Sequence, residues 1–147
     1  MKIGVPSEIK AQESRVGLTP KSVKELVKDK HTVLIQSNAG LGAGFSNSNY
    51  EQSGAKIVNS AEDIFNDSEM IIKVKEPLMN EVEMLRENQI LFTYLHLSAA
   101  PELTKGLIAS KSICIAYETV SDHNNKLPLL APMSAVAGRM SIQAGAY

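Results

Sequence analysis

Residues 70–118 read MIIKVKEPLMNEVEMLRENQILFTYLHLSAAPELTKGLIASKSICIAYE, and this stretch decides the fold class. It contains three short apolar runs, at 70–74, 90–95 and 112–117, separated by two amphipathic segments. Apolar runs of this length that do not alternate with polar residues are typical of strands buried on both faces, as in parallel sheets. The stretch therefore predicts a strand–helix–strand–helix–strand unit with right-handed crossovers.

Three further apolar runs extend this pattern to the N-terminal half of the chain. They lie at residues 3–5, 33–35 and 55–58, and they are again short and rich in Ile and Val. Together with the first three runs, they predict six strands of one mostly parallel sheet.

Helix signals occur between these runs. Thr19 precedes Pro20, which is the usual order of an N-cap and a first helical residue. Ser60 is followed by two acidic residues, which are favourable in the first turn of a helix. More helices are expected over residues 78–85, 101–109 and 132–147. The pattern predicts an α/β fold, a Rossmann-like three-layer domain whose sheet is flanked by helices and which ends in a linker helix.

The length and charge of the chain exclude several classes of protein. A chain of 147 residues fits one domain of ordinary size and is long enough to bury a core. The net charge of −1 gives no reason to expect binding to nucleic acid or to an anionic membrane surface.

The cysteine content and the N-terminus indicate a cytoplasmic protein. Cys114 is the single cysteine, so no disulfide can form within the chain, and this suits a reducing compartment. It lies in an apolar run, where a small buried side chain is expected. No signal peptide opens the chain, and no apolar run approaches the ~18 residues of a membrane span.

Three of the predicted strands end in a polar residue that could carry chemistry. Lys75, His96 and Glu118 each follow an apolar run, and they lie 21 and 22 residues apart, about one strand plus one crossover helix. Because parallel strands end at the same edge, we expect these side chains to lie together at the carboxyl edge of the sheet, where open α/β sheets bind ligands. Arg15, beyond the first predicted strand, is expected at the same edge.

These residue types suit a small carboxylate with a reacting carbonyl group. Arg15 offers a planar fork to a carboxylate, Lys75 can donate a hydrogen bond to oxygen, and His96 can exchange a proton near neutral pH. Simpler roles stay open: the two cations as solvated charges, His96 as an edge histidine of structural purpose, and Glu118 as the cap of a neighbouring helix.

The remaining histidines and the glycine-rich segment give weaker signals. His31 precedes a strand at the opposite edge and is expected to be structural, His123 lies in a polar loop, and no zinc spacing is present. Residues 38–45 hold three glycines but lack the G-x-G-x-x-G order of a dinucleotide-binding loop. A tight loop with left-handed backbone conformations, supporting the site, is the expected role of this segment.

Blocks along the whole chain resemble alanine dehydrogenases. They include the opening MKIGVPSEIK, the run ESRVGLTP, the run IKVKEP, the tripeptide LHL around His96, and the run LPLLAPMS. The related family of nicotinamide nucleotide transhydrogenases begins similarly but, by the family pattern, lacks the histidine. The resemblance therefore favours an alanine dehydrogenase over a transhydrogenase subunit.

The resemblance implies roles for individual residues. Arg15 and Lys75 would hold the carboxylate and carbonyl side of pyruvate or L-alanine, and Tyr94 would line the pocket. His96 would be the acid and base of the reaction. Ser134 would reach the cofactor NAD. Glu118 is similar to a position that takes magnesium in some members.

The implied reaction converts L-alanine, NAD and water to pyruvate, ammonium and NADH. Residues 1–131 would form the substrate domain and residues 132–147 the start of a helix leading to an NAD-binding domain. Family chains are more than twice as long and form hexamers, and they carry an NAD-binding domain and a final segment that folds back onto the first domain. We therefore expect this chain alone to have no turnover, and to self-associate or be poorly soluble because part of its core is exposed. Two other hypotheses stay open: a module that joins a separate nucleotide domain, and a small-carboxylate sensing domain.

Overall fold

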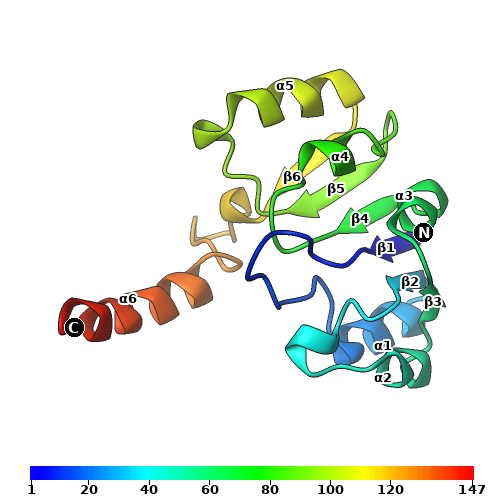
Figure 1. The fold of residues 1–147 in the computed structure, drawn as a ribbon, viewed down its shortest axis with the longest axis horizontal. Coiled ribbons are helices and arrows are strands. Elements are labelled where there is room, and N and C mark those ends of the chain that lie inside the picture. Colours follow the sequence, from blue (N-terminus) through cyan, green and yellow to red (C-terminus); the bar gives the residue numbers. More distant parts are fainter.

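A computed structural model describes all residues, 1–147, and shows one six-stranded sheet with helices on both sides (Figure 1). Every pair of neighbouring strands is parallel, and the strand order is β3-β2-β1-β4-β5-β6. The predicted α/β class and all six predicted strands are confirmed. The strands are β1 (Lys2–Val5), β2 (Thr32–Gln36), β3 (Lys56–Val58), β4 (Met70–Ile72), β5 (Ile90–Thr93) and β6 (Ile113–Ala116).

The helices begin largely where the capping residues predict. Thr19 Oγ1 accepts a hydrogen bond from the Ser22 N–H at 3.3 Å, and Ser60 Oγ accepts one from the Asp63 N–H at 3.1 Å. The helices are α1 (Pro20–Lys28), α2 (Asn47–Gln52), α3 (Ala61–Asp67), α4 (Met79–Val82), α5 (Pro101–Ser110) and α6 (Ala131–Gly145), with 3₁₀ turns η1 (Leu41–Ala43), η2 (Leu97–Ala99) and η3 (Tyr117–Thr119).

Several predicted boundaries differ from the structure, including those of the last strand (112–117 expected, 113–116 found) and the last helix (132–147 expected, 131–145 found). The strands expected over 70–74 and 90–95 are each two residues shorter, because the chain leaves regular pairing just where it forms the carboxyl edge. The helix expected over 78–85 is regular for only one turn, since its later hydrogen bonds tighten to the i→i−3 type. Helix α2 was not predicted, although Ser46 and Asn49 form a capping box at its start.

The core forms two layers, one on each face of the sheet. Alternate residues of β1 and β2 face α1 and α2, where Val23 and Tyr50 are fully buried. The opposite face packs against α3, α4 and α5, with Ile64 and Phe65 at its centre. This is the three-layer arrangement that the sequence predicts.

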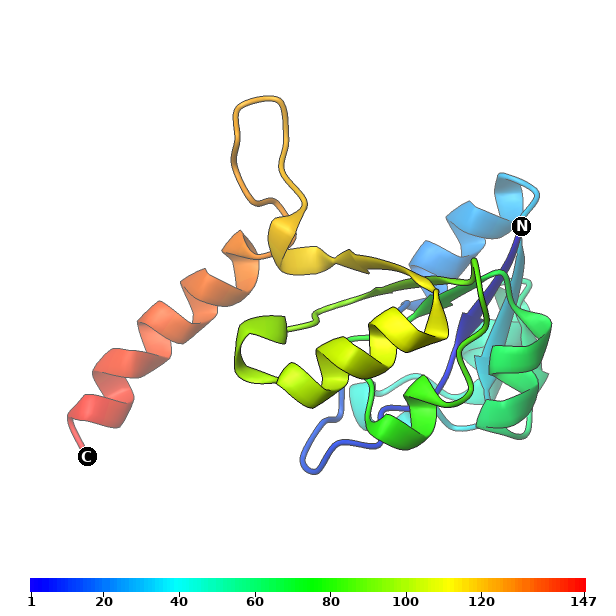
Figure 2. The same cartoon turned by 90° about the horizontal axis from the view of Figure 1, so that it is seen from above.

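Helices α1 and α2 cover only the β1–β3 half of their face. The outer strand β6 exposes Ile113 and Ile115 there by 49% and 38%. Figure 2 shows α6 projecting away from the body of the molecule. Its apolar side chains Met133, Val136, Met140 and Ile142 are exposed. No helix in the structure combines the length and the apolar character needed to cross a membrane.

The strand order places a crevice at the carboxyl ends of β1 and β4. The chain proceeds from β1 outward to β2 and β3, then returns to place β4 on the other side of β1. The connections after β1 and β4 therefore diverge, and ligands of open α/β sheets bind in the gap this creates.

Candidate active site

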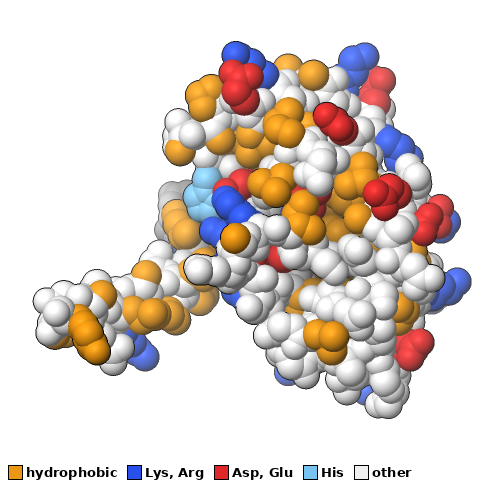
Figure 3. All heavy atoms as spheres, viewed as in Figure 1, with side chains coloured by type: hydrophobic (Ala, Val, Ile, Leu, Met, Phe, Trp, Pro, Cys, Tyr) orange, Lys and Arg blue, Asp and Glu red, His pale blue; other side chains and the backbone are white.

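The four candidate residues from strand ends share one edge of the sheet. Arg15 lies in the loop after β1, Lys75 three residues after β4, His96 three residues after β5, and Glu118 two residues after β6. These strands are consecutive in the order β1-β4-β5-β6, so their carboxyl ends are adjacent. Figure 3 shows basic, acidic and histidine side chains gathered at the side where α6 leaves the body.

A hollow of about 460 Å³ opens at this edge, and Arg15 and Tyr94 are among its walls. Tyr94 is 6% exposed, and its hydroxyl donates a hydrogen bond to the Leu129 carbonyl at 2.6 Å. Tyr94 and Tyr117 meet edge to face with 5.0 Å between ring centroids. The hollow thus combines one guanidinium with mostly apolar walls, which come from Val16, Thr19, Ala43, Phe45, Val74, Phe92, Tyr117, Leu129 and Met133.

Arg15 is held by a neighbouring carboxylate. Its Nε and Nη2 donate to the two oxygens of Glu13 at 2.8 and 2.5 Å, and Nη1 lies 3.5 Å from Met133 Sδ. The hydrogen bonds from Arg15 are the largest cause that lowers the pKa of Glu13 to about 2. Because Nε and Nη2 of the guanidinium group are already bonded to Glu13, Nη1 is the nitrogen that remains for a ligand carboxylate.

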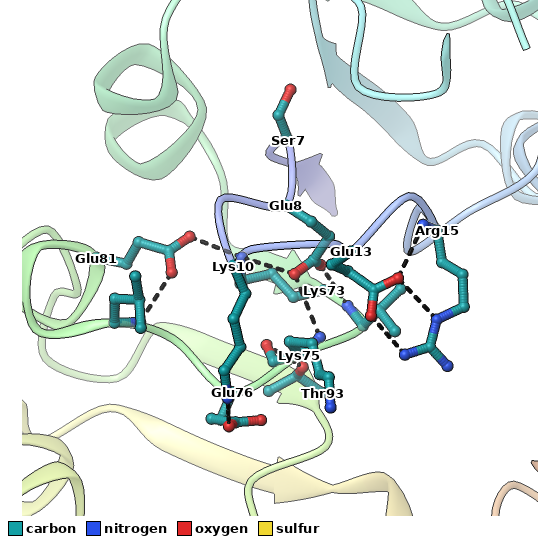
Figure 4. Close-up of polar contacts among 12 residues, drawn as sticks. Ser7, Glu8, Lys10, Glu13, Arg15, Lys73, Lys75, Glu76, Glu81 and Thr93 are labelled. Atoms are coloured by element: carbon teal, nitrogen blue, oxygen red, sulfur yellow. Dashed lines mark hydrogen bonds and ion pairs between the residues drawn. The ribbon is translucent and has the colours of Figure 1, made fainter. Parts of the chain in front are cut away.

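Lys75 is a cation between two ion pairs. Its amine makes no hydrogen bond or ion pair within the protein, while its carbonyl accepts from Thr93 Oγ1 at 2.9 Å. Figure 4 shows the Lys75 side chain between Glu76 and the Glu13–Arg15 pair. Its charge also contributes to the lowered pKa of both glutamates. The amine is thus available to a ligand oxygen.

His96 has a left-handed backbone conformation, with φ 48° and ψ 39°. Its ring stacks on that of Tyr94, with 5.8 Å between centroids and 25° between the ring planes, and its Nδ1 lies 3.4 Å from Glu76 Oε2. The side chain is 52% exposed. The imidazole therefore stands beside the hollow, one wall of which is Tyr94.

Glu118 supports the turn that carries His96. Its carboxylate accepts hydrogen bonds from the Leu95 N–H at 3.1 Å and from the His96 N–H at 2.8 Å. Burial by itself raises the pKa of Glu118, but these backbone hydrogen bonds outweigh it and the pKa is lowered. The carboxylate is thus engaged by the backbone, and no group of three His, Cys, Asp or Glu side chains is present to hold a metal ion. The residues here do not fit the magnesium site that the resemblance implies.

Ser134 lies apart from the other candidates. It is in the first turn of α6, it is exposed, and its hydroxyl makes no hydrogen bond within the protein. Its neighbour Met133 contacts Arg15, but the structure records no contact between Ser134 and the four edge residues.

The sequence analysis missed a buried ion cluster beneath the site. Lys73 Nζ lies 2.7 Å from Glu81 Oε1 and 3.3 Å from Glu8 Oε2, and all three side chains are at most 3% exposed. Glu8 also accepts the Val74 N–H at 2.6 Å, which ties the loop after β1 to the end of β4. A lysine inside an apolar run was the one available signal.

The glycine-rich segment braces the loop that carries Arg15. A Cβ on Gly42 would lie 2.9 Å from the Ser14 carbonyl oxygen, so only glycine allows this close approach. Asn38 and Gly44 have positive φ angles of 65° and 83°, which confirms the predicted left-handed conformations. Ala43 and Phe45 also reach the wall of the hollow. The segment contributes shape to the site.

Comparison with known proteins gives consistent results over nearly the whole chain. A family model described as "Alanine dehydrogenase/PNT, N-terminal domain" matches residues 4–137. A protein of Halomonas elongata named alanine dehydrogenase is 54% identical over 147 residues, which is 100% of this chain and 40% of the relative. One of Methanococcus maripaludis with the same name is 53% identical, over 99% of this chain and 39% of the relative.

Solved structures agree. One titled L-alanine dehydrogenase superposes with a TM-score of 0.93 at 55% identity, over 99% of this chain and 40% of that one. A transhydrogenase from Sinorhizobium meliloti shares the fold with a TM-score of 0.76 at 22% identity, over 80% of this chain and 35% of that one. The chain spans about 40% of the length of the relatives it matches.

Proposed function

Since this chain belongs to the alanine dehydrogenase/PNT N-terminal domain family, we propose that its carboxyl-edge crevice is the substrate half of an NAD-dependent L-alanine dehydrogenase. The substrates would be L-alanine and water in one direction, and pyruvate and ammonium in the other. The much lower identity to the transhydrogenase leaves alanine dehydrogenase as the favoured member of the family.

One observation supports this proposal: Arg15 lines a largely apolar hollow at the sheet edge where Lys75 and His96 also stand. Lys75 lies between the adjoining ion pairs, and His96 stacks on the wall residue Tyr94. Pyruvate has a carboxylate, a carbonyl oxygen and a methyl group. These groups match a guanidinium, an ammonium group and an apolar wall respectively.

In the proposed mechanism, Arg15 binds the substrate carboxylate through Nη1, and Lys75 donates a hydrogen bond to the carbonyl oxygen. The positive charge of Lys75 favours the negative charge that develops on that oxygen when ammonia attacks the carbonyl carbon. The added nitrogen transfers one of its protons to the oxygen, which gives a carbinolamine. His96 then donates a second proton to the hydroxyl group, the carbon–oxygen bond breaks, and water leaves behind a protonated imine. In the opposite direction, His96 takes a proton from the attacking water.

NAD would supply the hydride acceptor when bound. Ser134 is the residue of this chain proposed to contact it, because its exposed hydroxyl has no partner within the chain. Residues 1–131 would be the substrate domain, and α6 would lead to the segment that binds the nucleotide. A hexameric assembly and a cytoplasmic location are part of the same proposal.

Titration of the chain with pyruvate by isothermal calorimetry tests the proposal. We expect a heat of binding that Arg15→Ala abolishes, because the carboxylate loses the charge-assisted hydrogen bond from Nη1. Arg139→Ala is the matched control, since Arg139 is exposed on α6 and forms no ion pair or hydrogen bond with its side chain. Equal heats for Arg15→Ala and the unchanged chain would remove Arg15 from the site and with it the proposed pocket.

A further inference from the structure

The ring of His96 is linked to a fixed carboxylate from a neighbouring strand end. Glu76 Oε2 lies 3.4 Å from His96 Nδ1, and Glu76 Oε1 forms an ion pair with Lys10 Nζ. The three residues come from the loop after β1, the end of β4 and the end of β5. They form a chain of contacts across the carboxyl edge of three adjacent strands.

We propose that Glu76, anchored by Lys10, is the positioning residue that fixes the tautomer and orientation of the His96 imidazole. The inference rests on the proposed function only for the catalytic role of His96. The contacts that support it are present in the chain without any ligand.

The chemistry of the two groups determines the direction of the hydrogen bond. An ionised carboxylate can only accept, so the Nδ1 that faces Glu76 must carry the proton. In the neutral ring, Nε2 then keeps its lone pair and is the nitrogen that exchanges a proton with substrate. In other enzymes, a carboxylate likewise accepts the Nδ1–H of a histidine and orients its ring, while Nε2 exchanges a proton with the reacting group.

Glu76 is held firmly enough to serve in this way. Its side chain is 16% exposed, whereas the His96 side chain is 52% exposed. Burial alone raises the pKa of Glu76, but the hydrogen bond from Lys10 and the nearby positive charges lower it overall, so the carboxylate is ionised at neutral pH. A separation of 3.4 Å is long for a hydrogen bond, and such contacts commonly shorten when substrate binds.

Other contacts restrain His96 without choosing between its two nitrogens. Glu118 accepts the His96 backbone N–H at 2.8 Å, which fixes the main chain. Stacking on Tyr94 fixes the plane of the ring but permits a half-turn within that plane. Glu76 is the contact that makes the two ring orientations unequal.

The test is a ¹⁵N NMR measurement of the histidine tautomers in the ligand-free chain, above the pH at which the imidazoles become neutral. The His96 signal is identified by its loss in His96→Asn, which separates it from His31 and His123. We expect His96 to be mostly protonated at Nδ1, and to shift to mostly Nε2-protonated in Glu76→Leu, which has no acceptor at this position. Glu83→Leu, at an exposed acid directly after α4, is the control and should leave the tautomer unchanged.

A predominantly Nε2-protonated His96 in the unchanged chain, or an unaltered tautomer in Glu76→Leu, would overturn the proposal. If Glu76→Leu does not fold, Lys10→Met decides instead. It keeps the carboxylate but removes its anchor, so it should reduce the Nδ1-protonated fraction, and no reduction would count against Glu76. Pyruvate takes no part in these measurements. Failure of the proposed function would therefore appear only in the calorimetry, and failure of this inference only in the spectra.

Discussion

Replacement of Lys73 by methionine should be the most destabilising single substitution beneath the site. The change keeps a long flexible side chain but removes the charge between Glu8 and Glu81. Lys73 is 1% exposed and each glutamate 3%, so water cannot replace the lost ammonium group. Breaking a buried ion pair from one side typically costs roughly 3–5 kcal/mol, because the other charge stays buried without a partner.

The expected loss is large beside the total stability of a domain. Native domains are stable by about 5–15 kcal/mol, so Lys73→Met should remove a major part of the free energy of unfolding. For a chain of this size each kcal/mol corresponds to roughly 2–4 °C, which gives a melting temperature lower by roughly 6–20 °C. Urea unfolding followed by circular dichroism measures the free energy directly.

Two further variants test whether the loss of stability comes from the unpaired buried charges or from the removal of a lysine as such. Lys28→Met removes an exposed lysine whose Nζ lies 3.9 Å from Glu25, and it should cost less than about 1 kcal/mol. Neutralising both acids in Glu8→Gln/Lys73→Met/Glu81→Gln should restore much of the loss, because the amide oxygens can still accept the backbone N–H groups. A loss below about 1 kcal/mol in Lys73→Met, or a triple variant no more stable than the single one, would refute the reasoning.

The remaining predictions concern the pocket. Glu13→Gln should make the free energy of unfolding depend less on pH in the acid range. The pKa of Glu13 in the folded chain is about 2, below its ordinary value of 4.5, so its contribution to stability is present above pH 4.5 and is lost as pH falls toward 2. Unfolding curves at pH 2 to 5 measure this, and parallel profiles would contradict it. Gly42→Val should weaken pyruvate binding several-fold, because its Cβ would meet the Ser14 carbonyl; unchanged affinity in calorimetry would show that the loop yields. Mixed with L-alanine and NAD, the chain alone should give no NADH absorbance, since its glycine-rich loop lacks the dinucleotide order; measurable turnover would reject that expectation.

Much of the fold could be predicted from the sequence because burial leaves a direct mark on composition. Strands covered on both faces are apolar along most of their length, so runs such as 70–74 and 90–95 can be recognised as strands from their composition. Parallel strands then place Lys75 and His96 at one edge without further information. The family resemblance added roles to these residues, which the pattern alone left open between catalysis and solvation.

Contacts between distant segments could not be predicted in this way. Lys73 and Glu8 are 65 positions apart, and only the order β1-β4 brings them together inside the protein. The contacts that Glu76 makes with Lys10 and His96 could not be predicted either. Nothing in the sequence around these three residues indicates which residues they contact. Glu118 similarly carries no sign that it accepts the backbone of another strand end.

The sequence by itself determined which residues are buried in strands and which stand at their ends, because a local apolar pattern has a local cause. Only the tertiary structure decided how the charges pair. Pairing depends on distances between loops that the strand order and the packing of helices on the sheet establish, and no local property of the chain records those distances.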